Sequence, residues 1–329
     1  MTRSTRRLVI AAAGVLLFAT TSACGGSGSG ATTSTSEGSG STPVKISVGN
    51  LPIQASAALV LGKERGFFSD SGLDLTITPV EAPSMIPSLL SNSIQFGFLN
   101  PPAVLIARSN GVPVVGVETA ASYPKDPTSS PLGLMVAKGS GISSPADLVG
   151  KTIAVDALGQ VPHLSILNAL RSVGVDPTKI KFTEEPYPSM PASLESGKVD
   201  AVLSTEPFMS LIKASGGSLL LSASEGMSPG MPLSLWLTTD KFLKNNKDTV
   251  EKFRQAIDKS QTYAQAHLDE VRAILPSYTK VKAEVAAKIQ MYDYTPGYTS
   301  EEWDAWYKIL KTEGFIKKDI NPTDAYLPQ

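Results

Sequence analysis

The sequence predicts an α/β fold of two similar lobes, and an internal duplication with alternating strand and helix patterns is the basis of this prediction. Residues 83–102 (PSMIPSLLSNSIQFGFLNPP) recur without a gap as residues 188–207 (PSMPASLESGKVDAVLSTEP). A spacing of about 100 residues is too long for a solenoid repeat. It indicates two related lobes, and two lobes create a cleft between them.

The first copy alternates strand and helix patterns along the chain. The alternating, β-branched residues 44–49 predict a strand. Residues 56–65 predict a helix that Gly66 ends as a C′ glycine. Residues 73–80 predict a second strand, and the repeated helix leads to a third strand over residues 94–99.

The second copy repeats these elements in the same order. Residues 152–155 predict a strand, and residues 164–173 predict a helix that ends before Gly174. Residues 180–183 predict the next strand, and the second repeated helix precedes a strand over residues 199–203. The alternation predicts a parallel-core sheet with right-handed crossovers in each lobe.

Three further apolar segments connect the lobes or extend them. We assign the strand predicted over residues 112–120 to the first lobe. Residues 132–137 and 233–238 flank the second copy, and we interpret them as the two crossings of a two-strand hinge. The loop of residues 125–131 precedes the first crossing. The predicted domains are therefore lobe I over residues 44–131 and 238–329, and lobe II over residues 132–237.

The last third of the chain is predicted to be helical. Residues 249–268 place Val250, Phe253 and Ile257 on one helical face. Thr299 and Glu302 have the spacing of a capping box at the start of another helix, whose tryptophans at 303 and 306 are expected in the core. We expect this helical tail to pack on the first lobe.

The N-terminal residues 1–24 are predicted to be a signal peptide. Three arginines precede an apolar run over residues 8–18, which is shorter than the roughly 20 residues that span a bilayer. The segment Thr21-Ser22-Ala23-Cys24 resembles a bacterial lipobox, so Cys24 is the expected lipid anchor; the alternative is an unpaired thiol in a discarded leader. Residues 25–43 are rich in glycine, serine and threonine and predict a flexible tether. The route of export, general secretion or twin-arginine, stays open.

Composition restricts the possible partners. The chain has 29 basic and 30 acidic residues, and it becomes slightly acidic once the leader arginines are removed. Because no basic stripe occurs, we expect no nucleic-acid partner. A single cysteine and two histidines form no metal-ligand pattern. We expect neither a metal nor a cofactor, and we expect a monomer.

Three motifs carry a resemblance to a known family. They are GKERGFF at residues 62–68 with GLDL at 72–75, SSPADLVGKTIAV at 143–155, and GKVDA at 197–201 with Glu206-Pro207. Over roughly residues 44–315 the chain resembles the solute-binding proteins of bacterial ABC importers. Within them it resembles the group that includes sulfonate, taurine, nitrate and thiamine-pyrimidine binders. The resemblance implies the type II periplasmic-binding-protein fold, in which two lobes close on a small molecule, and a membrane permease as partner.

The expected ligand site lies at the carboxyl ends of the parallel strands, where open α/β sheets bind ligands. This rule selects loops that hold several carboxylates and no lysine or arginine. In the loop of residues 159–163, Val161 has no hydroxyl and Pro162 has no N–H. We therefore expect a neutral or cationic organic ligand rather than a sulfonate or nitrate. The selected loops are residues 50–55, 80–85, 100–103, 156–163, 184–190 and 205–208.

Nine residues are candidates for ligand contact. For several of them a structural role is the alternative: loop capping for the two amides at 54 and 100, helix capping for the serine, packing or capping for the histidine, a salt bridge for the glutamate, and core packing for the tyrosine and the tryptophan. The candidates are Gln54, Ser84, Asn100, Tyr123, Gln160, Val161, His163, Glu206 and Trp236.

The predicted function is that of the extracytoplasmic, membrane-anchored binding component of an ABC importer. One alternative is a ligand-sensing lipoprotein that signals to a membrane partner. Another is an enzyme resembling those of thiamine-pyrimidine synthesis. Cys24 is assigned to the anchor, only the histidines His163 and His267 remain, and no metal-ligand cluster appears. We therefore predict that the protein is not an enzyme.

Overall fold

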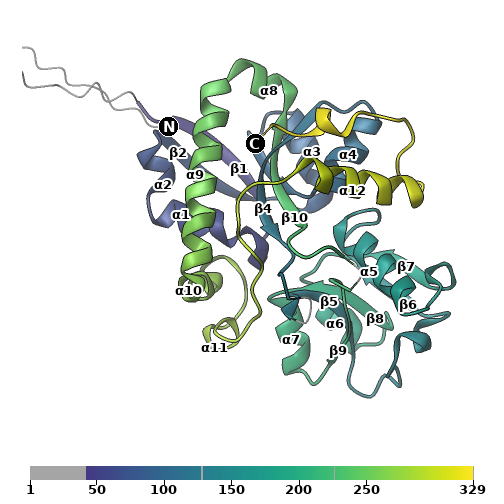
Figure 1. Cartoon of the computed structure of the whole chain (residues 1–329). Coiled ribbons are helices and arrows are strands. Elements are labelled where there is room, and N and C mark those ends of the chain that lie inside the picture. Colours follow the sequence, from purple (N-terminus) through teal and green to yellow (C-terminus); the bar gives the residue numbers. More distant parts are fainter. Residues whose placement is uncertain (1–41, 127–128, 226, 329) are drawn as a thin grey trace, which may run out of the picture. The chain divides into compact units, whose positions relative to one another are not determined.

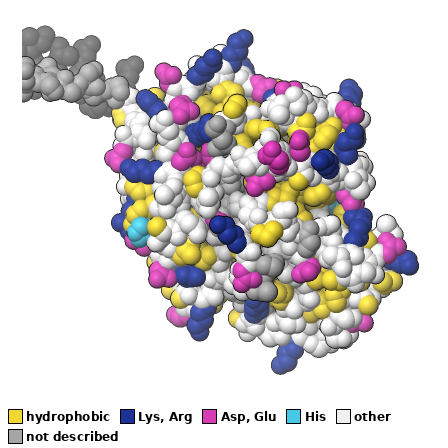
Figure 2. Space-filling model, in the orientation of Figure 1, with side chains coloured by type: hydrophobic (Ala, Val, Ile, Leu, Met, Phe, Trp, Pro, Cys, Tyr) yellow, Lys and Arg dark blue, Asp and Glu magenta, His cyan; other side chains and the backbone are white. Residues whose placement is uncertain are grey.

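A computed structural model describes residues 42–126, 129–225 and 227–328 (Figure 1). The predicted signal peptide, Cys24 and nearly all of the predicted linker lie outside the described residues. Within the described part, no helix combines the length and the apolar character needed to cross a membrane. On the face shown in Figure 2, basic and acidic side chains are interspersed.

The first sheet has five strands in the order β2-β1-β3-β10-β4. β1 pairs in parallel with β2 and β3, so the predicted parallel core is confirmed. β10 lies antiparallel between β3 and β4 and makes the sheet mixed. The strands are β1 (Val44–Asn50), β2 (Leu73–Pro79), β3 (Phe96–Leu99), β4 (Val114–Ser122) and β10 (Pro232–Thr239).

The second sheet repeats this arrangement with the order β7-β6-β8-β5-β9. β6 pairs in parallel with β7 and β8, and β5 lies antiparallel between β8 and β9. The duplication seen in the sequence therefore corresponds to two sheets of equal strand order. The strands are β5 (Leu132–Val136), β6 (Thr152–Val155), β7 (Lys181–Glu184), β8 (Ala201–Thr205) and β9 (Ser218–Ser222).

The two strands interpreted as hinge crossings each belong to a sheet. β5 is an inner strand of the second sheet and β10 is an inner strand of the first. The chain therefore passes between the sheets in the connections from β4 to β5 and from β9 to β10. A bond from the Tyr123 N–H to the Met231 carbonyl joins the two crossings. The apolar character of β5 and β10 reflects their complete burial, and the domain boundaries given above stay a prediction.

Helices cover the sheets and connect their parallel strands. α3 and α6 are the two repeated helices, and Gly66 ends α1 in the left-handed conformation, with φ +79°. The helices of the two α/β units are α1 (Ala57–Glu64), α2 (Phe67–Asp70), α3 (Ala82–Leu90), α4 (Pro101–Ser109), α5 (Val161–Ser172), α6 (Met190–Glu195) and α7 (Phe208–Ala214).

The C-terminal helices pack on the first sheet and its helices, as predicted. α9 lies against α1 and β4, and α12 lies against α4 (Figure 1). The capping box of Thr299 and Glu302 is present, and Trp303 and Trp306 are buried. These helices are α8 (Asp240–Asn245), α9 (Lys247–Ala266), α10 (Leu268–Tyr278), α11 (Ala283–Ala286) and α12 (Ser300–Thr312).

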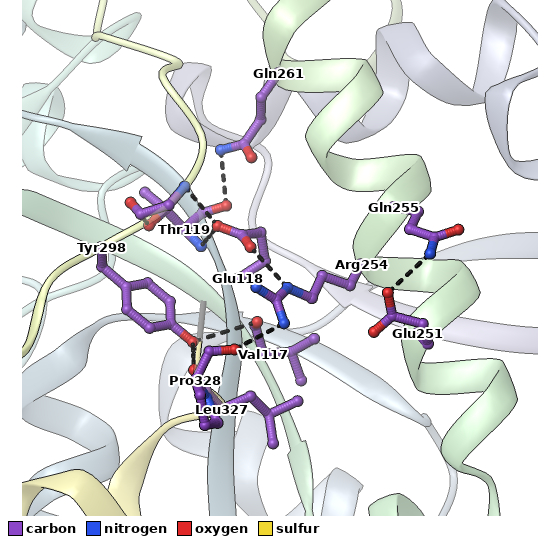
Figure 3. A network of polar contacts seen from close by, with 11 residues as sticks. Val117, Glu118, Thr119, Glu251, Arg254, Gln255, Gln261, Tyr298, Leu327 and Pro328 are labelled. Carbon is purple, nitrogen blue, oxygen red and sulfur yellow. Dashed lines mark hydrogen bonds and ion pairs between the residues drawn. The ribbon is translucent and has the colours of Figure 1, made fainter.

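A buried ion pair ties this tail to the first sheet (Figure 3). Glu118 on β4 is fully buried, and its Oε1 accepts hydrogen bonds from the N–H groups of Thr119 and Gly297, both at 2.8 Å. Its Oε2 accepts from Nε of Arg254 on α9 at 3.2 Å. Arg254 also donates to the Pro328 carbonyl. Four separate segments, namely β4, α9, the loop at Gly297 and the chain end at Pro328, therefore meet at one charged pair.

Candidate functional site

A cavity of about 420 Å³ lies at the carboxyl ends of the parallel strands, bounded by residues of both sheets. Its wall is mostly apolar, and its polar groups are few, which is typical of a small-molecule site. The first sheet and its helices contribute Leu51, Ile53, Phe98, Leu99, Asn100 and Ala103 among others; the second contributes Leu132, Asp156, Gln160, Val161, Glu184, Tyr187 and Thr205.

Asn100 lines the cavity from the first sheet. It directly follows β3 and is the N-cap of α4, where its Oδ1 accepts from the Ala103 N–H at 2.9 Å. The oxygen of the amide is therefore engaged in capping the helix, and the NH₂ group is what this side chain can offer to a ligand. Both roles considered from the sequence, capping and a position at the site, are compatible in this geometry.

Gln160 and Val161 line the cavity from the second sheet, at the start of α5. Gln160 is the N-cap residue, but its side chain makes no capping bond. Its Oε1 is buried without a hydrogen-bond partner among the described residues. Oε1 of Glu184 accepts from the Leu158 N–H at 2.8 Å and so holds the loop that leads to this helix.

Asp156 directly follows β6 and also lines the cavity. Its Oδ1 is buried and has no hydrogen-bond partner among the described residues. Burial raises the pKa of this carboxyl to about 7, against the smaller, opposing effects of hydrogen bonding from Ala157 and Tyr187. The charge of Glu184 raises the pKa further. Asp156 is therefore an acid that ionises near neutral pH at the cavity wall.

Gln54 and Ser84 do not line the cavity. Gln54 is fully buried in a short 3₁₀ helix over Gln54–Ser56, with its Nε2 2.9 Å from the sulfur of Met291. The expectation that Ser84 caps its helix is wrong, because Glu81 occupies the N-cap position of α3. Ser84 lies in the first turn, exposed to solvent.

The two aromatic candidates beside the crossings are core residues. Tyr123 is buried, and its hydroxyl is hydrogen-bonded to the Ser165 hydroxyl on α5. Trp236 on β10 is buried and packs edge-on against Phe98, with ring centroids 5.3 Å apart. Neither side chain lines the cavity, although Phe98 itself does. Core packing, the alternative considered from the sequence, describes both positions.

His163 also points away from the cavity. Its Nδ1 accepts from the Gly159 N–H at 3.0 Å, and its ring contacts the edges of Phe182 and Phe315. Burial lowers the pKa of this imidazole to about 4, so His163 is neutral in the folded protein at neutral pH. The histidine orders the loop that carries Gln160 rather than facing the cavity.

Glu206 follows β8 but turns toward the next helix. Its two carboxylate oxygens accept from the N–H of Ser210 at 3.1 Å and from its hydroxyl at 2.9 Å. Burial raises the pKa of Glu206, and the bonds from Ser210 oppose the rise. The carboxyl is therefore engaged at the first turn of α7, and its neighbour Thr205 is the residue that lines the cavity.

Two aromatic residues of the cavity wall were missed in the sequence. Tyr187 lies in a loop that the strand-end rule selected, so the rule could have found it. Tyr292 comes from the irregular segment after α11, and its hydroxyl bonds with that of Thr205 at 2.5 Å. No pattern in the sequence indicates that this tail segment reaches the cavity.

The electrostatics of the site are one-sided. None of the described residues that line the cavity is a lysine or an arginine. A smaller adjoining cavity of about 170 Å³ shares Asp156 and Tyr187 with the first, and its wall adds Glu81 and Glu185. Among the described residues, no group of three or more histidine, cysteine or acidic side chains is arranged to hold a metal. The charged side chains on the walls of these two cavities are therefore all acidic.

Comparisons with known proteins give one family and one fold. Residues 54–271 match a family model described as NMT1/THI5 like. The chain is 26% identical to the taurine-binding periplasmic protein of Escherichia coli (strain K12) over 64% of its own length and 63% of that protein.

A second relative is named as an enzyme. The chain is 27% identical to the 4-amino-5-hydroxymethyl-2-methylpyrimidine phosphate synthase of Legionella pneumophila, over 37% of each protein. The chain therefore spans less than two thirds of the length of either curated relative. Among solved structures, the alkanesulfonate-binding protein of Xanthomonas axonopodis pv. citri bound to MOPS superposes with a TM-score of 0.73, at 17% identity, over 87% of this chain and 99% of that one.

Proposed function

This chain belongs to the NMT1/THI5-like family, and we propose that it is the extracytoplasmic solute-binding component of an ABC importer. It captures a small organic molecule in the cavity between its two sheets and delivers it to a membrane permease. The observation that carries the proposal is the cavity at the strand ends, with an apolar wall and few, convergent polar groups. The predicted lipid anchor at Cys24 would keep the protein at the membrane.

The ligand is a neutral or cationic organic molecule. The cavity wall carries the carboxyls of Asp156 and Glu184 and no lysine or arginine among the described residues. A sulfonate or nitrate would face these carboxyls without a compensating charged side chain. This differs from the ligands named for the taurine-binding and alkanesulfonate-binding relatives.

A thermal-shift screen on the mature protein tests both statements. The library contains sulfonates, nitrate, amines, nucleobases and thiamine precursors. A ligand at 100 times its Kd stabilises the folded state by about 2.7 kcal/mol. We expect shifts from neutral or cationic compounds and none from sulfonates or nitrate; a clear shift with taurine contradicts the charge argument.

A matched pair of variants locates the binding. Ala82 lines the cavity, and Ala82→Trp should abolish the shift by filling the space. Ala283 is exposed on α11, and Ala283→Trp should leave the shift intact. Equal shifts in both variants would place the ligand elsewhere on the protein.

The enzyme named among the relatives motivates one further test. His163 is engaged with Gly159 and lies outside the cavity wall, so this histidine does not face a ligand there. We expect the bound molecule to be recovered chemically unchanged after long incubation, as measured by mass spectrometry. Recovery of a converted product would favour the enzyme. Co-purification with a sensor kinase instead of a permease would favour the ligand sensor.

A further inference from the structure

Most hydroxyls around the cavity are already engaged with the protein. The hydroxyl of Tyr292 bonds with that of Thr205 at 2.5 Å and lies 3.4 Å from the Pro131 carbonyl. The Ser234 hydroxyl donates to the Ala121 carbonyl at 3.5 Å. These groups have little capacity left for a ligand, so recognition falls to the remaining polar atoms of the wall.

Two buried side-chain acceptors of the described wall have no partner, and both come from the loop between β6 and α5. Oδ1 of Asp156 and Oε1 of Gln160 are buried and have no partner among the described residues, and both residues line the cavity. A buried acceptor without a donor costs about 1–3 kcal/mol. A bound molecule that donates to both atoms would remove this cost.

The rest of the wall agrees with a donor ligand that has a flat apolar body. Asn100 offers an NH₂ group because its oxygen caps α4. Phe98 and Tyr187 contribute aromatic rings, to which both a flat body and a cation are attracted. Four acidic side chains gather here: Asp156 and Glu184 line this wall, and Glu81 and Glu185 line the adjoining cavity.

We propose that Asp156 and Gln160 together bind a protonated nitrogen group, an ammonium or an amidinium, on a ligand whose flat apolar body lies beside Phe98. The inference rests on the proposed function and names the ligand class of the same site. A charge-assisted hydrogen bond to a carboxylate is stronger than a neutral one, so Asp156 provides most of the discrimination. Gln160 directs the second N–H.

Binding of such a cation depends on pH, because it requires the ionised form of Asp156. The titratable groups that face this carboxyl are Glu184, Tyr187 and Tyr292, with Glu81 and Glu185 on the adjoining cavity and Glu206 next to Thr205. None of them is a cation that would hold the pKa of Asp156 down. With that pKa at about 7, ionisation should make the Kd about tenfold weaker at pH 6 than at pH 8.

Three aromatic probes that differ in the charge of their head group test the proposal by isothermal titration calorimetry on the mature protein. Benzamidine is cationic, benzamide is neutral, and benzenesulfonate is anionic, and all three share one flat ring. We expect benzamidine to bind at least tenfold more tightly than benzamide, and benzenesulfonate not to bind. Asp156→Asn should remove the preference for benzamidine. Asp319→Asn, an exposed acid on the C-terminal segment, should keep it.

The outcomes separate this inference from the proposed function. Tighter binding of benzamide or benzenesulfonate, or an unchanged benzamidine Kd in a folded Asp156→Asn variant, overturns the inference and leaves the proposed function standing. A Kd for benzamidine that does not vary between pH 6 and pH 8 also overturns it. If neither these probes nor any library compound binds, both the inference and the proposed function fail.

Discussion

Two buried carboxyls of this protein have opposite surroundings. Glu118 accepts hydrogen bonds from two backbone N–H groups and from Arg254 (Figure 3), and it is not among the residues that line the cavity at the strand ends. Asp156 keeps one buried oxygen without a partner and lines the cavity. The Glu118 carboxyl holds segments of the fold together, whereas the Asp156 carboxyl keeps an oxygen that can accept a hydrogen bond from a ligand.

The largest expected loss of stability comes from replacing Glu118, the carboxyl whose oxygens all have hydrogen-bond partners. Glu118→Gln removes the charge that Arg254 pairs with and places an NH₂ group among N–H donors. Removing one partner of a buried ion pair costs about 3–5 kcal/mol, and we expect a loss of this size in the free energy of unfolding. Urea denaturation followed by circular dichroism measures it. Asp156→Asn is the control and should lower the free energy of unfolding by less than about 1 kcal/mol at pH 7. Equal losses in the two variants would contradict the difference drawn between Glu118 and Asp156.

The stability of the protein should depend on pH through Asp156. The folded state raises the pKa of Asp156 from 3.8 to about 7, so between these values it holds a proton that the unfolded chain has released. Stability from this group is therefore present at low pH and is lost as the pH rises, by at most about 1.4 kcal/mol per pH unit. The stability of Asp156→Asn relative to the wild type should therefore increase from pH 4 to pH 7, by up to a few kcal/mol in the free energy of unfolding.

Unfolding curves of both proteins across this pH range provide the measurement. His163 has a lowered pKa and acts in the opposite direction, since its neutral form is lost from the folded state only at low pH. Because His163 is present in both proteins, its contribution cancels in the difference. Parallel pH profiles for the two proteins would mean that Asp156 is not destabilised by burial.

The loop that carries Asp156 is expected to tolerate less change than an ordinary turn. Gly159 has φ +73°, and a Cβ there would lie 2.7 Å from the ring of Phe315. Gly150 has φ +79° and open space around the same position. Both alanine variants suffer the left-handed backbone, but Gly159→Ala should lose about 1–3 kcal/mol more from the clash.

A double-mutant cycle isolates that clash. In a Phe315→Ala background, the difference between Gly159→Ala and Gly150→Ala in the free energy of unfolding should disappear. The Phe315 ring comes from the C-terminal segment, so a persisting difference would show that the loop is constrained by something other than this tail.

The smallest effect concerns an exposed ion pair. Arg171 on α5 pairs with Glu313 just after α12, and its side chain is 45% exposed, compared with 18% for Arg254 beside Glu118. Exposed pairs contribute about 0.2–1 kcal/mol and are screened by salt. Arg171→Ala should change the free energy of unfolding by less than about 1 kcal/mol, and Arg254→Ala should cost several times more. Comparable losses at high salt would contradict this ranking.

Local pattern was enough to predict the strands, the repeated helices and part of the site. Strand and helix periodicities depend on neighbours within a few residues, and both copies carried them. Asn100, Gln160 and Val161 were found because each directly follows or closely follows a strand end, where parallel sheets place their loops. The same rule selected the loops of Asp156 and Tyr187 without singling out either residue.

Residue type alone did not predict whether a polar side chain lines the cavity or bonds with the protein. His163 and Glu206 occupy loops at the carboxyl ends of strands, as expected, but their polar atoms bond with Gly159 and Ser210 within a few residues. A polar side chain takes the nearest available partner, and the sequence does not reveal which partner the backbone brings near. Ser84 failed as a helix cap for a different reason: α3 begins at Ala82, so Glu81 occupies the N-cap position.

Three features were readable from the amino-acid sequence: two like α/β units, a parallel core in each sheet, and strand-end loops that carry carboxylates but no lysine or arginine. Three other features became visible only in the folded protein. β10 enters the first sheet and β5 the second, Tyr292 reaches the cavity from the C-terminal segment, and Asp156 rather than Glu206 keeps an oxygen without a partner. The difference lies in how far apart along the chain the interacting residues are. Periodicity and strand ends are set by adjacent residues, whereas strand insertion and hydrogen-bond satisfaction depend on groups that only folding brings together.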